Sequence, residues 1–235
     1  MGGVRVFDDD GALATAAAEE VAQALARGLA ALGRASLGLS GGRTPVATYR
    51  KLAAEPLRSR LDWARVRIFF ADERAVPPGD PESNFRLARE TLIDPLRLPP
   101  RNVHRMKGEY SDLAVAVEEY EAHLDGPIDA LILGVGEDGH VASLFPGSRL
   151  VSERAHRVAA VTDSPKPPAQ RLTLTPRALE EARQVLVLAT GDAKAAAVAR
   201  ALEGEVQPRE VPARLVRERD WYLDRAAAAG LRMRA

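Results

Sequence analysis

The sequence contains no cysteine, which excludes disulfide bonds, thiol nucleophiles and cysteine-based metal sites. No apolar run reaches the roughly 18–20 residues that a membrane-spanning helix needs. The N-terminal residues also lack the apolar core of a signal peptide, so we expect a cytoplasmic protein with no membrane partner. Lys+Arg and Asp+Glu both number 33. A chain without excess positive charge is a poor candidate for binding nucleic acid.

Lysine is scarce, because arginine supplies 29 of the 33 basic residues. The four lysines are Lys51, Lys107, Lys166 and Lys194. We attribute the imbalance, together with the abundance of alanine, to nucleotide bias in the source genome. The scarcity makes each lysine that the chain retains more informative.

Short apolar runs alternate with segments of helical periodicity along the chain. Continuous apolar runs such as 131–133 and 185–188 are typical of strands that are buried on both faces. This alternation predicts an α/β fold with an open, mostly parallel sheet, Rossmann-like, with helices on both faces. The expected strands are 4–7, 35–39, 66–71, 128–135, 172–175 and 185–189, and the expected helices are 13–32, 45–54, 82–93, 111–124 and 193–202.

The length and composition favour one compact unit. The 235 residues are 46% hydrophobic and 28% charged, which is the balance of a globular protein with a sizeable core. Two proline-rich stretches, 76–81 and 164–168, interrupt the pattern. Because expected elements resume at once on both sides of each stretch, we interpret both as surface loops rather than domain linkers.

The first candidate site segment follows an expected strand, where ligands bind in open parallel sheets. It has the sequence Ser-Gly-Gly-Arg-Thr-Pro over 40–45, with Thr44 as the expected N-cap and Pro45 as the first helical residue. The two glycines expose backbone N–H groups and the helix N-terminus adds partial positive charge, so a phosphate would fit. The alternative is a well-capped strand–helix turn. Ser40 and Arg43 beside the glycines favour phosphate.

Three charged residues, Asp72, Glu73 and Arg74, follow the next expected strand. They could form a solvated sheet edge. Alternatively, Arg74 binds a phosphate bidentately while Asp72 accepts hydrogen bonds from sugar hydroxyls or orients a base. The sequence leaves both interpretations open. Asn84 lies near the start of the next expected helix, where it either faces the same site or caps the helix.

The strongest signal is the segment 134–143, in which a buried strand ends in three glycines, two acidic residues, a histidine and a serine. Histidine suits proton transfer near neutral pH, so His140 is a candidate acid–base residue. Asp138 could orient its imidazole or bind substrate. The G-x-G-x-x-G spacing is weak evidence for a dinucleotide site, and the G-x-S-x-G of serine hydrolases is absent around Ser143. We expect structural roles for the other histidines, His104, His123 and His156.

A fourth candidate region joins two later segments. Arg171 enters one expected strand, and Asp192 and Lys194 follow another. If Asp192 caps the next helix, the Lys194 cation opposes the helix dipole, and a bound anion would remove that conflict. A plain ion pair between Asp192 and Lys194 is the alternative.

Together these segments resemble the 6-phosphogluconolactonase family, within the larger group that includes glucosamine-6-phosphate isomerase/deaminases. Each stretch is modest alone, but the ordered set is specific. The resemblance implies an isomerase/deaminase-type open α/β sheet and one such domain over residues 1–235. The matching stretches follow the family's order over about the whole chain: 40–45, 72–74, 83–85, 134–143, 171–173, 191–194 and 211–213.

The resemblance also implies a function, the cofactor-free hydrolysis of 6-phospho-D-glucono-1,5-lactone, which is the second step of the oxidative pentose phosphate pathway. In this interpretation His140 activates a water, Asp138 orients the site, backbone N–H groups meet the oxyanion, and no metal takes part. The residues expected to bind substrate or phosphate are Ser40, Gly41, Gly42, Arg43, Asp72, Arg74, Asn84, Ser143, Arg171 and Lys194.

Phe145 separates two branches of this group. Isomerase/deaminases carry a catalytic glutamate before a proline in this motif, whereas here Phe145 precedes Pro146. The resemblance therefore favours the lactonase, to whose pattern Ser143 conforms. The alternatives are a glucosamine-6-phosphate isomerase/deaminase and a non-catalytic sugar-phosphate sensor. We expect a monomer or small homo-oligomer with a phosphosugar lactone as its partner.

Overall fold

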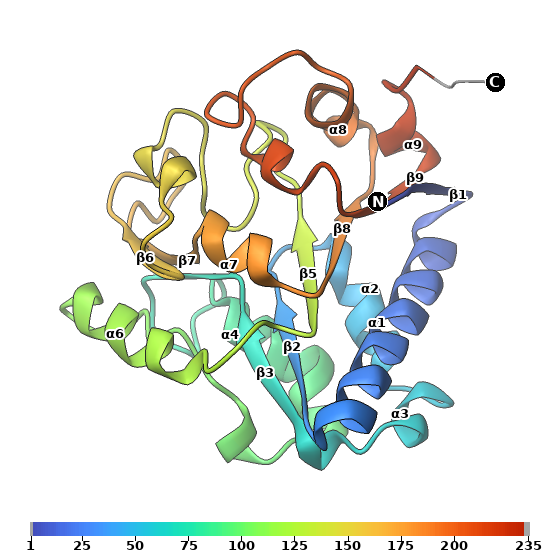
Figure 1. Cartoon of the computed structure of the whole chain (residues 1–235), viewed down its shortest axis with the longest axis vertical. Coiled ribbons are helices and arrows are strands. Elements are labelled where there is room, and N and C mark those ends of the chain that lie inside the picture. Colours follow the sequence, from blue (N-terminus) through green and yellow to red (C-terminus); the bar gives the residue numbers. More distant parts are fainter. Residues whose placement is uncertain (1, 233–235) are drawn as a thin grey trace.

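A sheet of six parallel strands forms the centre of the computed structural model, which describes residues 2–232 (Figure 1). The strand order is β1-β9-β8-β5-β2-β3. The order and direction confirm the predicted open parallel sheet. The strands are β1 Val4–Phe7, β2 Ala35–Leu39, β3 Val66–Phe70, β5 Ala130–Gly134, β8 Gln184–Ala189 and β9 Asp220–Asp224.

A second sheet of three antiparallel strands lies beside the first. It consists of β4 Asp72–Arg74, β7 Arg171–Leu174 and β6 Val158–Val161, in that order. Ala71 joins the two sheets, because its N–H donates to Leu39 O at 2.7 Å and its carbonyl accepts from Leu174 N at 2.7 Å. The carboxyl end of β3 therefore runs directly into the second sheet.

Helices cover the central sheet. Figure 1 shows α1 and α2 along one side of it and α6 and α7 on the other. Buried alanines such as Ala14, Ala17 and Ala18 give α1 a slim face that packs closely on the strands. The helices are α1 Asp10–Leu32, α2 Thr44–Leu52, α3 Leu57–Arg60, α4 Asn84–Ala88, α5 Asp94–Leu96, α6 Leu113–His123, α7 Pro176–Glu181, α8 Ala195–Leu202 and α9 Arg225–Ala228.

Several predicted elements differ from the observed ones. The strand expected at 172–175 is β7, which belongs to the antiparallel sheet. The sequence pattern missed β4 because its three residues are all charged, and it also missed β6 and β9. The helix expected at 82–93 begins at Asn84 and changes to a π-helix over Arg89–Ile93.

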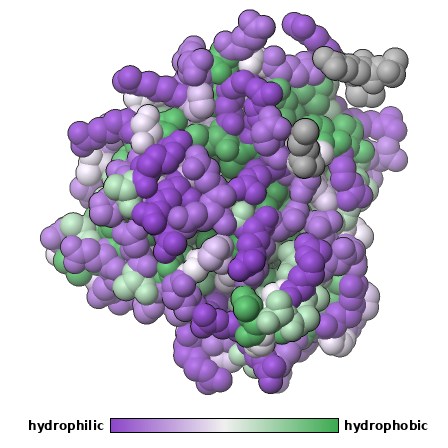
Figure 2. All heavy atoms as spheres, viewed as in Figure 1, coloured by the Kyte–Doolittle hydropathy of each residue, from purple (hydrophilic) through white to green (hydrophobic). Residues whose placement is uncertain are grey.

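The surface seen in Figure 2 is mainly hydrophilic, with apolar residues showing between polar side chains. No helix within residues 2–232 has the length and apolar character needed to cross a membrane. The exposed large hydrophobic residues of the described chain are Val4, Val6, Leu32 and Val115.

Candidate active site

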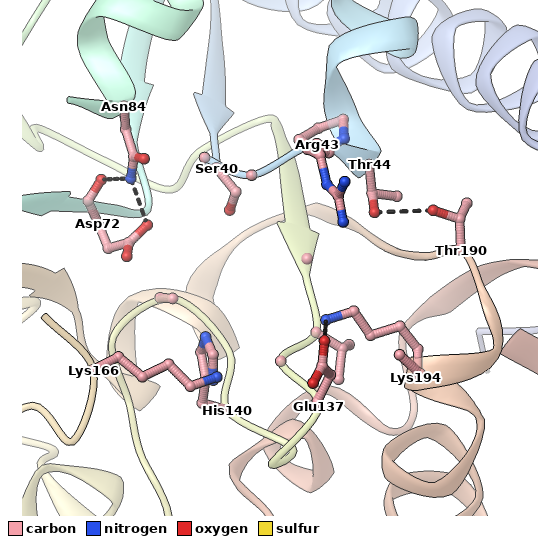
Figure 3. A pocket seen from close by; sticks show the side chains of 18 of the residues that line it. Ser40, Arg43, Thr44, Asp72, Asn84, Glu137, His140, Lys166, Thr190 and Lys194 are labelled. Carbon is pink, nitrogen blue, oxygen red and sulfur yellow. Dashed lines mark hydrogen bonds and ion pairs between the residues drawn. The ribbon is translucent and has the colours of Figure 1, made fainter. Parts of the chain in front are cut away.

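A pocket of about 400 Å³ opens at the carboxyl ends of the central strands (Figure 3). Segments that follow β2, β5 and β8 form its walls together with residues of the second sheet. Two predicted residues, Asp138 and Ser143, do not line it. The predicted residues that do are Ser40, Gly41, Gly42, Arg43, Asp72, Arg74, Asn84, His140, Arg171 and Lys194.

His140 and Asp138 form a hydrogen-bonded pair at the wall of the pocket. Nδ1 of His140 lies 2.5 Å from Asp138 Oδ1. The opposite ring nitrogen, Nε2, has no hydrogen-bond partner among the described residues and belongs to a side chain that is 19% exposed. The ring of Phe145 packs against the imidazole with 4.7 Å between the centroids. The pair therefore holds one nitrogen of the imidazole and leaves the other available to a ligand.

The charge of Asp138 is stabilised within this pair. Burial pushes the pKa of the Asp138 carboxyl upwards, but the hydrogen bond and charge of His140 and the nearby Lys166 charge hold it well below its usual range. The carboxylate is therefore ionised at neutral pH. An ionised partner on Nδ1 directs the imidazole and stabilises it when it takes up a proton at Nε2.

Two glycines of the 134–143 segment are required by the turn that presents His140. Gly136 donates its N–H to the His140 carbonyl at 2.9 Å, and a Cβ on Gly136 would overlap the imidazole ring and the Asp138 carboxylate. Gly139 has φ +84°, a conformation that side chains disfavour. The glycines thus allow a tight loop in which the side chains of Asp138 and His140 meet although only Gly139 lies between them.

The 40–45 segment meets the pocket at the N-terminus of α2. A Cβ on Gly41 would overlap the Asn84 amide, so the backbone and that side chain lie in direct contact. The hydroxyl of Ser40 donates to Ile132 O at 2.9 Å and is thereby turned towards the sheet. The prediction that Thr44 caps the helix is wrong. Arg43 is the N-cap residue, and the Thr44 hydroxyl lies 3.1 Å from that of Thr190.

Asp72 lies in a buried polar network at one side of the pocket. Its Oδ1 accepts from Asn84 Nδ2 at 3.0 Å and its Oδ2 accepts from the Ser143 hydroxyl at 2.8 Å. Ser143 is fully buried, and its N–H donates to Thr173 Oγ1. The expectation that Ser143 contacts substrate is therefore corrected: this serine lies behind Asp72 and orients its carboxylate.

Arg74 is tethered in the same network. Its Nη1 donates to Asn84 Oδ1 and to the Glu82 carbonyl, both at 2.7 Å, while its buried Nε has no partner among residues 2–232. Figure 3 shows Asn84 and Asp72 on one side of the pocket and Arg43 on the other. Arg74 thus belongs with the Asp72 side.

Glu73 is buried behind this side of the pocket and holds it in place, a role that the sequence pattern did not reveal. Its carboxylate accepts four hydrogen bonds: Oε1 from the N–H groups of Arg74 at 2.8 Å and Asn84 at 2.7 Å, and Oε2 from the N–H of Phe85 at 2.8 Å and the Ser83 hydroxyl at 3.0 Å. Burial raises the pKa of Glu73, and the four donors oppose that shift. The carboxylate fixes the start of α4, and with it Asn84.

Arg171 lines the pocket, but its guanidinium is occupied by main-chain acceptors. Nε donates to Pro168 O at 3.1 Å, and Nη2 donates to Pro167 O at 2.9 Å and Lys166 O at 3.3 Å. The guanidinium also lies over the Phe145 ring at 5.5 Å. Arg171 therefore holds the proline-rich loop 164–168 against the site.

Two lysines enter the pocket, and the sequence analysis selected only one. Lys194 Nζ lies 3.8 Å from Glu137 Oε1, so the alternative of a pair with Asp192 is wrong. Lys166 Nζ lies 3.4 Å from Asp138 Oδ1. The scarcity of lysine was the only signal that could have selected Lys166, because its loop has no pattern typical of a site.

The remaining histidines lie outside the pocket. His104 stacks on Phe69 and accepts a hydrogen bond from Arg67 Nε at 3.2 Å, while His123 packs against it. Residues 2–232 contain no cluster of three or more His, Asp or Glu side chains placed to hold a metal ion.

An open parallel sheet with a histidine–carboxylate pair and a cationic, glycine-lined pocket at its carboxyl edge defines an α/β enzyme for small anionic substrates. The comparisons give the family. The sequence model described as glucosamine-6-phosphate isomerases/6-phosphogluconolactonase matches residues 8–224, and the chain belongs to this family.

Three known proteins illustrate the similarity. The 6-phosphogluconolactonase of Mycobacterium tuberculosis is 38% identical over 97% of this chain and 98% of its own length. The structure of 6-phosphogluconolactonase from Trypanosoma brucei superposes with a TM-score of 0.85 at 29% identity, covering 98% of this chain and 99% of that one. A monomeric glucosamine-6-phosphate deaminase gives the same TM-score at 25% identity, with coverage of 98% and 100%. The fold thus serves both branches of the family.

Proposed function

We propose that this protein hydrolyses 6-phospho-D-glucono-1,5-lactone to 6-phospho-D-gluconate, a step of the oxidative pentose phosphate pathway. Its relatives over nearly the whole chain are 6-phosphogluconolactonases. The observation that carries the proposal is the pair of His140 and Asp138, which leaves Nε2 available at a pocket with basic side chains. Such a pocket suits a phosphorylated substrate, and the pair supplies the proton transfer that ester hydrolysis needs.

His140 acts as the base and then as the acid. Its Nε2 takes a proton from a water as the water oxygen forms a bond to the lactone carbonyl carbon, and the carbonyl π electrons move to the carbonyl oxygen. When the tetrahedral intermediate collapses, the bond from that carbon to the ring oxygen breaks. The ring oxygen then takes the proton from Nε2. The acid that forms loses its proton to solvent, and His140 is neutral again.

Asp138 supports both steps without touching the substrate. Its carboxylate accepts from Nδ1, so the proton-free nitrogen of neutral His140 is Nε2. The negative charge also stabilises the imidazolium formed when water is deprotonated. No cofactor enters this chemistry as we propose it.

We place the phosphate at the N-terminus of α2, between Arg43 and Lys194. These two side chains lie on the same side of the pocket in Figure 3. The backbone at Gly41 and Gly42 adds N–H groups, and neither glycine has a side chain of its own to cover them. Asp72, Asn84 and Arg74 are then left for the sugar, since they occupy the other side. Binding energy from the phosphate orients the lactone at His140.

Phe145 favours the lactonase over the deaminase. Its ring is buried against His140 and beneath Arg171, at the position where the resemblance places the catalytic glutamate of deaminases. A phenyl ring supplies no carboxylate for ring opening. A sensor has no need of an acid–base pair with a free nitrogen at the ligand.

The test is a turnover assay on 6-phosphogluconolactone generated in situ, with the spontaneous hydrolysis rate subtracted. We expect His140→Gln to lower kcat by about 10²–10⁴-fold, as removal of a general base does. His156→Gln is the matched control, because His156 is exposed and does not line the pocket. Wild-type turnover in folded His140→Gln protein would exclude the mechanism. Ammonia release from glucosamine 6-phosphate would support the deaminase instead.

We also propose a cytoplasmic location. A charged sugar phosphate does not cross a lipid bilayer, so the enzyme must be in the compartment where its substrate is made. The site lies within one chain, which allows a monomer or a small homo-oligomer. We treat the chain as one catalytic domain, because both sheets contribute to a single pocket.

A further inference from the structure

A second cation stands at the reactive end of the pocket. Lys166 Nζ and His140 Nδ1 both lie against the same atom, Asp138 Oδ1, at 3.4 and 2.5 Å. The lysine is therefore a direct neighbour of the imidazole. Figure 3 shows Lys166 reaching towards His140 from one side of the pocket and Lys194 reaching towards Glu137 from the other.

The contact between Lys166 and Asp138 is long. Charge-assisted hydrogen bonds between an ammonium and a carboxylate are about 2.7–2.9 Å, and the observed separation is 3.4 Å. Asp138 instead makes its short hydrogen bond to His140. An ammonium carries three N–H donors, and no other residue of the described chain accepts a hydrogen bond from Lys166 Nζ. The ammonium is thus available to a closer anion in the pocket.

Hydrogen bonds from neighbouring residues fix the backbone of the loop that carries Lys166. Arg171, which is 4% exposed, donates to the carbonyls of residues 166, 167 and 168. The Ser164 hydroxyl donates to the Lys166 carbonyl at 2.8 Å, and Ser164 N donates to Ala169 O at 3.0 Å. Arg171 also covers Phe145, whose ring packs against the His140 ring. One buried guanidinium therefore sets both the lysine loop and the packing behind the histidine.

We propose that Lys166 binds the lactone carbonyl oxygen as it gains negative charge, and that Arg171 is the residue that positions the lysine loop. This inference rests on the proposed lactone hydrolysis. The lactone carbonyl carbon must lie within reach of a water held by His140 Nε2. The negative charge on the carbonyl oxygen therefore develops close to the neighbouring ammonium. A fixed cation at a developing oxyanion stabilises the transition state more than the ground state. The two pocket lysines then have separate tasks: Lys194 binds phosphate and Lys166 assists the reaction.

Steady-state kinetics on the lactone separate these tasks. We expect Lys166→Met to lower kcat about 100-fold, as the loss of one oxyanion donor does, with KM changed less than about threefold because ground-state binding is retained. Lys166→Arg keeps the charge and should retain kcat within about tenfold of wild type. Lys194→Met should chiefly raise KM. Lys107→Met is the control, since Lys107 pairs with Glu119 outside the pocket.

The role of Arg171 is tested by non-additivity. If Arg171 acts through Lys166, the folded variant Arg171→Met lowers kcat, and adding it to Lys166→Met causes little further loss. If Arg171→Met fails to fold, the Lys166 variants alone test the proposal. Unchanged kcat in Lys166→Met, or a rise in KM alone, would overturn the inference while His140→Gln still supports the function. A wild-type protein with no turnover would overturn the proposed function and this inference with it.

Discussion

Glu73→Gln removes one charge from beneath the active site while keeping the shape of the side chain. Glu73 is 3% exposed, and its two oxygens accept from three backbone N–H groups and one hydroxyl. An amide has only one acceptor oxygen, so its NH₂ group must face two of the four donors. The best arrangement places NH₂ towards the Ser83 hydroxyl, which can rotate and accept. The N–H of Phe85 then loses its partner.

The expected cost follows from that count. One buried N–H without a partner costs about 1–3 kcal/mol. The bonds that remain lose charge assistance, which is about another 1 kcal/mol. Removing a charge from a buried site offsets part of this, because burial raises the pKa of Glu73 and so penalises the ionised form. We therefore expect a loss of about 2–3 kcal/mol in the free energy of unfolding, or about 4–12 °C in Tm for a chain of this size.

Urea unfolding near pH 7.5 measures this loss, and the lactonase assay measures its effect on the site. Glu90→Gln is the matched control, since Glu90 is exposed and forms an ion pair with Arg86 at 2.9 Å, and the loss of such a surface pair has little effect on stability. KM should also rise in Glu73→Gln, because Asn84 and Arg74 lose their anchor. A variant within about 0.5 kcal/mol of wild type, which is an ordinary surface effect, would refute the argument that Glu73 accepts all four bonds in solution.

Two further predictions concern the loop and the packed histidines. Gly136→Ala should lower kcat by about tenfold or more by displacing His140 from Asp138. Gly126→Ala is the control and should leave kcat unchanged, because its Cβ meets open space. Equal kinetics in both variants would contradict the close packing of Gly136 against His140. Burial, then the Arg67 and His123 charges, lower the pKa of His104 to about 4. The folded protein therefore binds this proton less readily than the unfolded chain, and the stability from neutral His104 is complete above about pH 6.5 and falls towards pH 4. Urea midpoints between pH 7.5 and 4.5 should fall less in His104→Gln than in wild type, and parallel curves would argue against it.

Four strands of the central sheet, β2, β3, β5 and β8, were predictable because nearly all of their residues are buried. The apolar runs at β5 and β8 can be recognised as strands from their own residues. The strands β1 and β2 begin and end where the pattern predicts. The second sheet was not predictable in the same way. Its strand β4 is the charged triplet Asp-Glu-Arg, which becomes a strand only because β7 supplies its hydrogen-bond partners.

The order of residues along the chain was enough to predict which segments meet at the pocket. Glycines and polar residues placed directly after parallel strands must gather at one edge of the sheet, and this brought together Gly41, His140 and Lys194. The loop 134–143 also determined the pairing of His140 with Asp138, because only Gly139 lies between them and the glycines allow the turn.

What each polar side chain does in the pocket depends instead on the folded arrangement around it. Ser143 is buried behind Asp72, Arg171 is occupied by loop carbonyls, and Lys166 reaches the Asp138–His140 pair from a loop that looked like plain surface. The partners of Ser143 and Lys166 lie more than twenty residues away along the chain. A side chain's direction depends on which distant donor or acceptor satisfies it when it is buried, and spacing along the chain carries no record of that choice.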